Sequence, residues 1–361
     1  MSWRILRASD GSAHEIGTGD MAAGLGWGTL VMEINLATLA RRRRPLIRLS
    51  PRQEPERIFS LEATDDGRLH LLRRHGSAVT HLSIGLGREP NVGMLRLSYH
   101  WDQHRGSSLL TAENLTKGTI RQQEGTHALP LLPEEISALF EPTGGSLIHP
   151  AIDWIGLADH WQTVGPTPGL APETLVDTPR GVVPVAMIRP GDLVLTADRG
   201  PLPVLWQGRV SLPTLGHFRP VRILAPYFGL EEDMVVLPGQ RIALSGAEVE
   251  YQFGEEEVLI EARHLANGQT AIWEPEAEVV PCHGLLFERH ALVRAGGIWT
   301  ESLYLGRIAR TTDLASATAP GALAENGRLP IHAAPVRREL KDYEALALML
   351  SLLNANAVIA A

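Results

Sequence analysis

Short apolar runs separated by proline- and glycine-containing turns fill residues 169–208, and this feature most constrains the fold. The segment reads GLAPETLVDTPRGVVPVAMIRPGDLVLTADRGPLPVLWQG. Residues 178–181 place turn-forming residue types between two apolar runs, which predicts a strand, a tight turn and a second strand. Residues 190–192 repeat the arrangement before a further predicted strand, Leu193 to Thr196. The pattern indicates a module of short hairpins.

The same segment resembles the opening of the hedgehog/intein (Hint) superfamily, specifically the bacterial Hint-domain proteins. Their module typically begins with a cysteine, a proline-containing turn and the motif T-x-x-T-P-R-G. Three later segments resemble the family in order and approximate spacing: VVLPGQRIALSG (235–246), EVLIEARHLANG (257–268) and CHGLLFERHALVRAGGIWTES (282–302). Four matched segments over residues 169–306 imply an all-β Hint module.

The family resemblance implies autoprocessing, in which the first cysteine attacks the preceding carbonyl and forms a thioester that is then cleaved. The matching position is Gly169, which has no side chain. Gln240 stands where the family has a histidine that polarises the scissile amide, and it cannot transfer a proton near neutral pH. A second family histidine, six positions before His290, is matched by Gly284. We therefore expect a Hint fold without autoprocessing, acting as a binding or scaffold protein.

The alternative is self-cleavage near residue 168 by a displaced nucleophile. Thr167 and Thr174 flank Gly169, but a hydroxyl needs an adjacent base, and turn or strand roles are preferred for both. His283 lies one position from the family histidine, and a shift of one residue in a strand turns a side chain to the opposite face. His290 and His283 are thus weak substitutes, and no catalytic residue is assigned.

A metal site is the next alternative, because His264, His283 and His290 with Cys282 are all possible zinc ligands. Their spacing does not match a known ligand pattern, and adjacent strand residues point to opposite faces, so neither metal nor cofactor is expected. Cys282 is the only cysteine, which excludes an intramolecular disulfide. We expect it to be an inert, half-buried thiol, and His290 with Arg289 to form structural hydrogen bonds.

The first 162 residues are predicted to form a β-sandwich. In residues 94–101 Leu95, Leu97, Tyr99 and Trp101 alternate with polar residues, and residues 68–75 and 78–86 read as a hairpin around Gly76 and Ser77. Residues 133–142 read as a helix.

Parts of residues 28–160 weakly resemble concanavalin-like jelly rolls, so a carbohydrate-binding module is a second alternative. It would use Trp101 or Trp154 for stacking and Asp102, His104 or Asn114 for polar contacts. We favour the interpretation that the tryptophans close the sandwich core.

The expected organisation is thus mainly β: a jelly-roll-like sandwich at 1–162, a Hint domain at 163–310, and a linker with a C-terminal helix at 311–361. Residues 160–172 read as an exposed tether and residues 316–330 as a loop or disordered link. In the last helix Leu340, Tyr343, Ala347 and Leu350 are predicted to form the buried face, with Glu339, Lys341 and Asp342 outward.

Composition excludes several classes of function. The net charge of -8 argues against nucleic-acid binding, and the basic run Arg41 to Arg44 reads as a solvated segment end. No segment is long and apolar enough for a bilayer, and the first residues lack the apolar core of a signal peptide. We expect a soluble protein, cytoplasmic or exported without a conventional signal, with no membrane insertion and with a glycan or protein as the possible partner.

Overall fold

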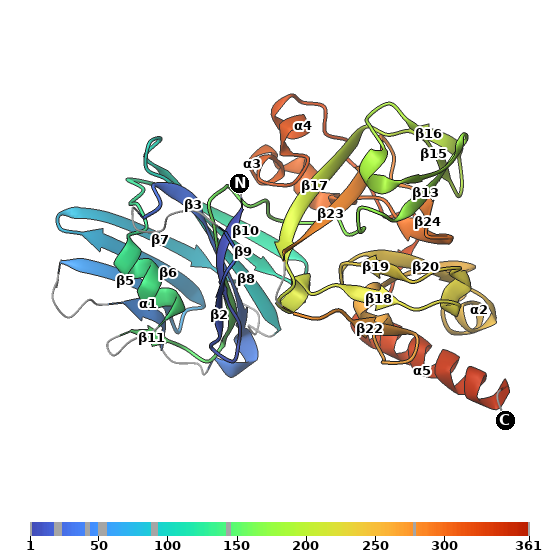
Figure 1. Cartoon of the computed structure of the whole chain (residues 1–361), viewed down its shortest axis with the longest axis horizontal. Coiled ribbons are helices and arrows are strands. Elements are labelled where there is room, and N and C mark those ends of the chain that lie inside the picture. The colour runs from blue at the N-terminus through green and yellow to red at the C-terminus, as the bar shows by residue number, and fades with distance from the viewer. Residues whose placement is uncertain are drawn as a thin grey trace. The chain divides into compact units, whose positions relative to one another are not determined.

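The computed structural model describes residues 2–17, 24–39, 44–49, 56–87, 93–141, 146–276 and 279–359, which form two compact units. Unit 1 comprises Met1–Val164 with Ala277–Val279, and unit 2 comprises Gly165–Glu276 with Val280–Ala361. In Figure 1 the first runs from blue to green and the second from green to red. The chain is mainly β with a C-terminal helix, as the sequence predicts.

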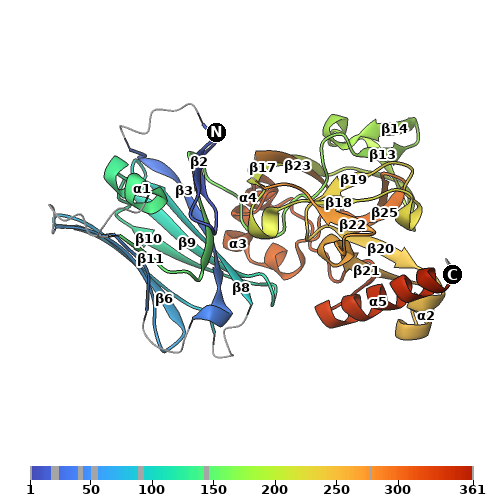
Figure 2. The same cartoon turned by 60° about the horizontal axis from the view of Figure 1, so that its bottom comes forward.

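Unit 1 contains two antiparallel sheets (Figures 1 and 2). The strand order is β10-β9-β8-β3-β12-β1-β2 in the seven-stranded sheet and β11-β4-β5-β6-β7 in the five-stranded sheet. The strands are β1 (Trp3–Arg7), β2 (Ala13–Glu15), β3 (Trp27–Asn35), β4 (Arg44–Leu49), β5 (Arg57–Ala63), β6 (Arg68–His75), β7 (Ala78–Gly85), β8 (Met94–Asp102), β9 (Ser107–Asn114), β10 (Thr119–Thr126), β11 (Leu147–Ile148) and β12 (Ile152–Ala158). The helical elements are η1 (Leu36–Thr38) and α1 (Pro133–Phe140).

Side chains from both sheets meet in one apolar core. Trp101 of β8 and Phe59 of β5 belong to the same buried cluster, which also includes Leu139 of α1. The predicted hairpin is confirmed, since β6 and β7 pair antiparallel with His75 opposite Ala78. The alternation along these strands therefore marks the residues that form a two-layer core.

The second face of β8 is buried as well. Arg96 and His100 point away from the core, yet they are 6% and 0% exposed. Arg96 donates to Glu33 Oε1 of the neighbouring β3 at 2.8 Å, and His100 Nε2 lies 2.7 Å from the Gln162 carbonyl oxygen. Glu33 and Gln162 thus provide hydrogen-bond partners for Arg96 and His100. The alternating sequence pattern alone would predict that these two side chains face solvent.

Unit 2 contains three sheets around a second core (Figures 1 and 2). The main path of the largest sheet is β14-β13-β24-β25-β20-β21-β26, with β15 pairing β16 and β24; the others are β17-β23 and β19-β18-β22. The strands are β13 (Leu175–Thr178), β14 (Gly181–Pro184), β15 (Leu193–Thr196), β16 (Gly200–Pro203), β17 (Trp206–Pro213), β18 (Val221–Ile223), β19 (Met234–Val236), β20 (Arg241–Ser245), β21 (Glu257–Glu261), β22 (Ala271–Trp273), β23 (Val279–Leu286), β24 (Leu292–Ala295), β25 (Ile298–Glu301) and β26 (Arg338–Glu339). The helical elements are η2 (Val185–Met187), η3 (Gly216–Phe218), η4 (Tyr227–Gly229), α2 (Ala247–Phe253), η5 (Ala262–Leu265), η6 (Gly306–Arg310), α3 (Thr312–Ser316), α4 (Gly321–Glu325) and α5 (Asp342–Ile359).

The predicted hairpin around residues 178–181 and the predicted strand Leu193–Thr196 are confirmed. β13 and β14 pair with Thr178 opposite Gly181, so the turn lies at the intervening Pro-Arg pair. β15 has the predicted limits, and its Val194 is buried in the unit 2 core. Turn residues and short apolar runs were sufficient to place these strands.

Residues 316–330 are more ordered than predicted, because part of this mostly irregular segment is helical. They contain the end of α3 and all of α4. Leu323 and Leu329 pack against a small cluster of Leu286, Leu303 and Leu305. These two leucines anchor a segment whose small residues otherwise contribute little apolar surface.

The C-terminal helix is confirmed, but its predicted buried face is wrong. Tyr343 and Leu350 are 66% and 53% exposed, whereas Ala345, Leu348 and Met349 are buried in the unit 2 core. The predicted starting residue, Leu340, precedes the helix and is buried. Glu339 does not face out either, because it lies in β26, which pairs in parallel with β21.

The segment 160–172 is not an exposed tether, which corrects a further prediction. Gln162, Val164, Pro168 and Gly169 are buried. Leu170 forms antiparallel bridges to both Val236 and His283. Backbone pairing on both sides, which no composition rule reveals, holds Leu170 within unit 2.

Two further expectations concern the basic run Arg41 to Arg44 and membrane insertion. Arg41 to Arg43 of the basic run lie outside the described residues, and Arg44 begins β4. Within the described ranges, every helix is too short or too polar to cross a lipid bilayer.

Candidate functional site

The segment after Pro168 is inserted between two parts of unit 2. The Leu237 amide donates to the Gly169 carbonyl oxygen at 2.8 Å. On the other side Leu170 and His283 exchange two backbone hydrogen bonds of 2.9 and 2.7 Å. The Pro168–Gly169 peptide bond, which matches the scissile bond of the resembled family, is thus fixed from both directions.

A small cavity adjoins this peptide bond. Its volume is about 20 Å³, which is room for a water but not for a substrate. The structure brings together the three matched motif positions, Gly169, Gln240 and Gly284, although they come from distant parts of the sequence. The lining residues are Thr167, Pro168, Gly169, Leu170, Gln240, Gly284, Leu285, Val293, Glu301, Ser302 and Leu303.

The Gln240 side chain fills the space beside Gly169. A Cβ atom added to Gly169 would lie 2.7 Å from Gln240 Oε1 and 3.0 Å from Gln240 Cβ. Gln240 Nε2 donates to the Glu301 carbonyl oxygen at 2.9 Å, which holds the amide in place. The space that a nucleophilic side chain at residue 169 would need is therefore occupied by the Gln240 side chain, which its hydrogen bond to Glu301 holds in place.

Gly284 is covered in a similar way. A Cβ atom there would lie 2.9 Å from Pro168 Cβ and 3.1 Å from Pro168 Cα. Real Cβ atoms almost never approach other heavy atoms below 3.0 Å. Proline 168 thus packs where a histidine side chain would have to leave the backbone.

His283 does not take the place of the missing histidine. It pairs through its backbone with Leu170, and its Nδ1 atom lies 2.7 Å from Gln207 Nε2. The imidazole is absent from the cavity lining, whereas the adjacent Gly284 is part of it. Burial and then the charge of Arg209 lower the pKa of His283, so the ring is a neutral hydrogen-bond acceptor for the Gln207 amide.

The two threonines differ in position. Thr167 lines the cavity, and its Oγ1 donates to the Gly165 carbonyl oxygen at 3.1 Å. Thr174 lies outside the cavity lining, and its backbone shapes the turn that leads into β13 through a bond from Val185 N to its carbonyl oxygen. Of the two, Thr167 alone stands beside the peptide bond that a nucleophile would have to attack.

A buried ion network, which the sequence analysis missed, borders the cavity. Glu301, at 7% exposure, lines it; His290 Nε2 lies 3.1 Å from Glu301 Oε1, and Arg241 Nη1 lies 2.9 Å from Glu301 Oε2. Burial acts to raise the pKa of Glu301, but His290 and Arg241 outweigh it and leave that pKa below its usual value. Nothing in the spacing of these residues indicates that the fold would bury them together.

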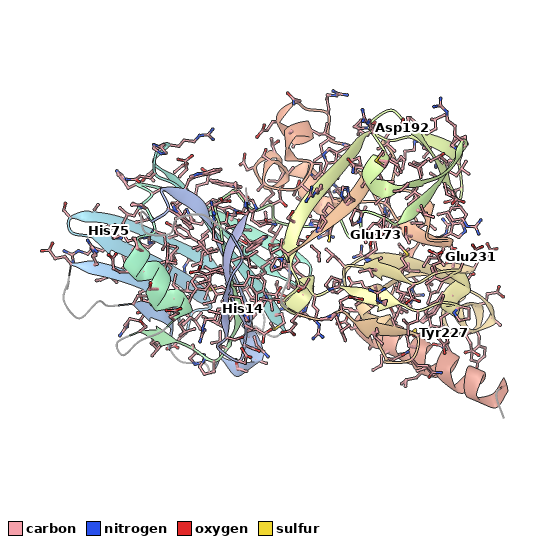
Figure 3. All side chains as sticks on the ribbon, viewed as in Figure 1. His14, His75, Glu173, Asp192, Tyr227 and Glu231 are labelled. Carbon is pink, nitrogen blue, oxygen red and sulfur yellow. The ribbon has the colours of Figure 1, made fainter. Side chains whose placement is uncertain are left out.

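The four possible metal ligands do not converge. His264 Nε2 lies 3.3 Å from Asp342 Oδ1, whereas His283 Nδ1 lies 2.7 Å from Gln207 Nε2. In the described part of the chain, no three histidine, cysteine or acidic side chains lie close enough to hold a metal ion. Cys282 is 4% exposed, and burial together with the nearby Glu173, labelled in Figure 3, raises its pKa to about 12.

The tryptophans named for the carbohydrate alternative lie in the interior of unit 1. Trp101 is 0% and Trp154 2% exposed, and Trp101 Nε1 donates to the Leu25 carbonyl oxygen at 3.0 Å. A sugar therefore has no exposed ring face on which to stack at either position.

The polar residues of that alternative have local roles in turns. Asp102 Oδ1 accepts a 3.1 Å hydrogen bond from the Arg105 amide, and Asn114 Oδ1 accepts one of 2.8 Å from the Lys117 amide. His104 is exposed in the first of these turns. The carboxylate and the amide oxygen are thus used by the backbone that they cap.

Comparisons with known proteins give one family match and several similar solved structures. Residues 168–307 match the family model described as the Hint domain. A search of curated proteins found no match.

Similar solved structures include the bacterial intein-like domain from Clostridium thermocellum, at 13% identity and a TM-score of 0.29, covering 38% of this chain and 99% of that one. The MchDnaB-1 intein (N145AA) has 19% identity and a TM-score of 0.25, covering 37% and 98%. The Ruminococcus gnavus IT-sialidase CBM40 bound to alpha2,3 sialyllactose has 13% identity and a TM-score of 0.27, covering 39% and 78%.

Proposed function

This chain is a Hint-domain-containing protein, and we propose that its Hint domain is a binding scaffold that has lost autoprocessing. The observation that carries the proposal is the filled space beside Gly169, where Gln240 Oε1 would lie 2.7 Å from any added Cβ. A nucleophile at this position would have to displace an anchored side chain before it reached the Pro168 carbonyl carbon.

The chemistry of the resembled family would need three functions that the matched residues do not supply. Gly169 has no group to attack the preceding carbonyl. The Gln240 amide donates a hydrogen bond to Glu301 instead of polarising the peptide bond, and it has no proton to exchange near neutral pH. Gly284 offers no acid or base, and its neighbour His283 is bonded to Gln207 on another side.

What supports the scaffold function is that the same substitutions leave the surrounding packing complete. Pro168 covers Gly284, and backbone hydrogen bonds hold Gly169 and Leu170. Both features support a chain in which residues 1–168 stay attached. We infer that the protein presents its N-terminal unit on the Hint module to a protein or glycan partner rather than releasing it.

Intact-mass measurement tests the loss of autoprocessing. The purified chain is incubated for days at pH 7.5, alone, with dithiothreitol and with hydroxylamine, which cleave thioesters and oxyesters. We expect the full-length mass in every sample. A fragment that ends at Pro168 would contradict the proposal.

The Thr167→Ala variant is the matched control for that experiment, because Thr167 lines the cavity next to Pro168 and, with Ser302, supplies a hydroxyl there. Loss of such a fragment in this variant would assign the cleavage to a displaced hydroxyl nucleophile. A fragment that persisted in the variant would indicate a contaminating protease or another nucleophile.

A further inference from the structure

The segment that precedes α5 is tied to the Hint module by side-chain and backbone contacts along its whole length. We call Val336–Asp342 the C-terminal strap. Arg337 pairs with Asp198 at 2.6 Å and with Glu257 at 2.8 Å, and Asp342 pairs with Arg263 at 2.6 Å. Between these ends β26 pairs with β21, and the Leu340 amide donates to the Leu259 carbonyl oxygen at 2.9 Å.

The first residue of the strap is held by a titratable group. The Val336 amide donates to His290 Nδ1 at 2.9 Å. A ring nitrogen that accepts a hydrogen bond carries no proton, so His290 in this arrangement is neutral with its proton on Nε2. His290 Nε2 donates to the Ser302 carbonyl oxygen at 3.3 Å and lies 3.1 Å from Glu301 Oε1.

Several charged or titratable groups face the His290 ring. The Tyr304 and His332 rings lie 4.7 and 5.7 Å from it, centre to centre. Glu301 is the adjacent anion, and Arg241 joins Glu301 to Glu339 of the strap, at 2.9 and 3.3 Å. Burial lowers the pKa of His332, which keeps that ring neutral and leaves Glu301 and Arg241 as the nearest charges. One buried network therefore joins the strap to a carboxylate that lines the cavity beside Gly169.

We propose that His290 is a pH-sensitive latch for the C-terminal strap. When the ring gains a second proton from solvent, Nδ1 becomes a donor that faces the Val336 N–H, and the hydrogen bond between them is lost. The strap then loses its attachment at Val336.

The opening is local, because the other contacts of the strap respond differently to acid. The Arg337 pairs and the Arg263–Asp342 pair contain no group that titrates with an ordinary value between pH 5 and 7. His264 lies 3.3 Å from Asp342, so its protonation strengthens the far end of the strap. Acid is therefore expected to loosen Val336, while residues 337–342 and α5 stay attached.

Hydrogen exchange of the Val336 amide in the full chain tests the latch. Protection factors, which remove the pH dependence of the intrinsic exchange rate, are compared at pH 7.5 and 5.5. We expect protection of Val336 to fall by up to about tenfold at the lower pH, the equivalent of one lost neutral hydrogen bond. Unchanged protection in the native chain would overturn the proposal.

Two variants identify the responsible histidine. His290→Asn places an amide oxygen near the Nδ1 position, so it accepts from Val336 but does not titrate, and Val336 protection should become independent of pH. The matched control is His264→Gln at the other end of the strap, which should keep the native pH dependence at Val336. Equal loss of protection at pH 5.5 in His290→Asn would contradict the latch.

A measurement on the unmodified chain keeps the test decisive even where the Asn variant fails to fold. The ¹⁵N chemical shifts of the His290 ring at pH 7.5 distinguish a protonated from an unprotonated Nδ1. The proposal requires Nδ1 to be unprotonated at that pH, and a proton on Nδ1 would overturn it.

Discussion

Residue 169 shows how a missing side chain and its neighbours fit each other. Gly169 leaves space that the Gln240 amide fills, and Pro168 lies against Gly284. The family resemblance identified positions 169, 240 and 284 from the sequence. It did not reveal that neighbouring side chains occupy the space beside the two glycines. It also missed Glu301 and Arg241, because the burial of a charge depends on how distant strands pack and not on local pattern.

The fit between Gly169 and Gln240 predicts a coupled pair of substitutions. Gly169→Ala should lower the free energy of unfolding by about 1–3 kcal/mol, because the new methyl group overlaps Gln240. In Gly169→Ala/Gln240→Ala the penalty of the methyl group should largely disappear. Urea denaturation of both single variants and the double variant measures the coupling.

Gly239→Ala is the control for this cycle, since a Cβ atom there has no neighbour within 4 Å. It reports the effect of replacing a glycine next to the site without a clash. Additive effects of the two substitutions at 169 and 240 would mean that the side chains do not compete for one space.

Cys282 is predicted to be inert. At 4% exposure and with a pKa raised to about 12, its thiolate is scarce and covered at pH 8. Iodoacetamide should leave the native chain unlabelled and add one group per chain after denaturation in urea. Rapid labelling of the native chain would show that this thiol is accessible.

At the scale of elements, the sequence predicted strands better than helix orientation. β13 and β15 follow from short apolar runs and turn residues. Residues 345–350 read ALALML, which is apolar on every side, so the pattern contains no information on which face of α5 is buried. Packing of Ala345, Leu348 and Met349 into the unit 2 core identifies that face, and such long-range contacts are invisible in local periodicity.

The orientation of α5 predicts opposite results for two leucines of the same helix. Leu348→Ala should lower the free energy of unfolding by about 2–5 kcal/mol, because Leu348 is 0% exposed in the unit 2 core. Leu350→Ala should change it by less than about 0.5 kcal/mol, because Leu350 is 53% exposed. Thermal or urea denaturation compares them, and equal effects would mean that the helix is rotated.

At the scale of the whole molecule, buried ionisable groups make both units sensitive to acid. In unit 1 burial lowers the pKa of His100 to about 4, and in unit 2 burial lowers that of His332. A histidine whose folded pKa is depressed is protonated more readily in the unfolded chain, so stability falls as the pH drops from about 6.5. Glu135 and Glu301 have lowered pKa values through their partners, so their contributions are lost at lower pH still.

His100→Gln tests the largest of these effects. Between pH 6.5 and 4 His100 should contribute a loss of up to about 3 kcal/mol to the unfolding of unit 1. Glutamine retains a donor for the Gln162 carbonyl oxygen but does not titrate, so the variant should lose less stability in acid than the native chain. His104→Gln, in an exposed turn, is the control, and calorimetry at several pH values gives the comparison. Parallel curves for all three proteins would contradict the assignment.

The insertion of Leu170 between Val236 and His283 also decides where this chain can be divided. A gene cut after codon 171 would give a Hint module without its inserted segment, and the facing carbonyl and amide groups of His283 would lose their partners. If the segment were added back as a separate peptide, its backbone would have to pair with Val236 on one side and His283 on the other, as in split proteins reassembled from fragments. To express either half alone, the chain should therefore be divided before Gly165, so that residues 165–171 stay with the second half.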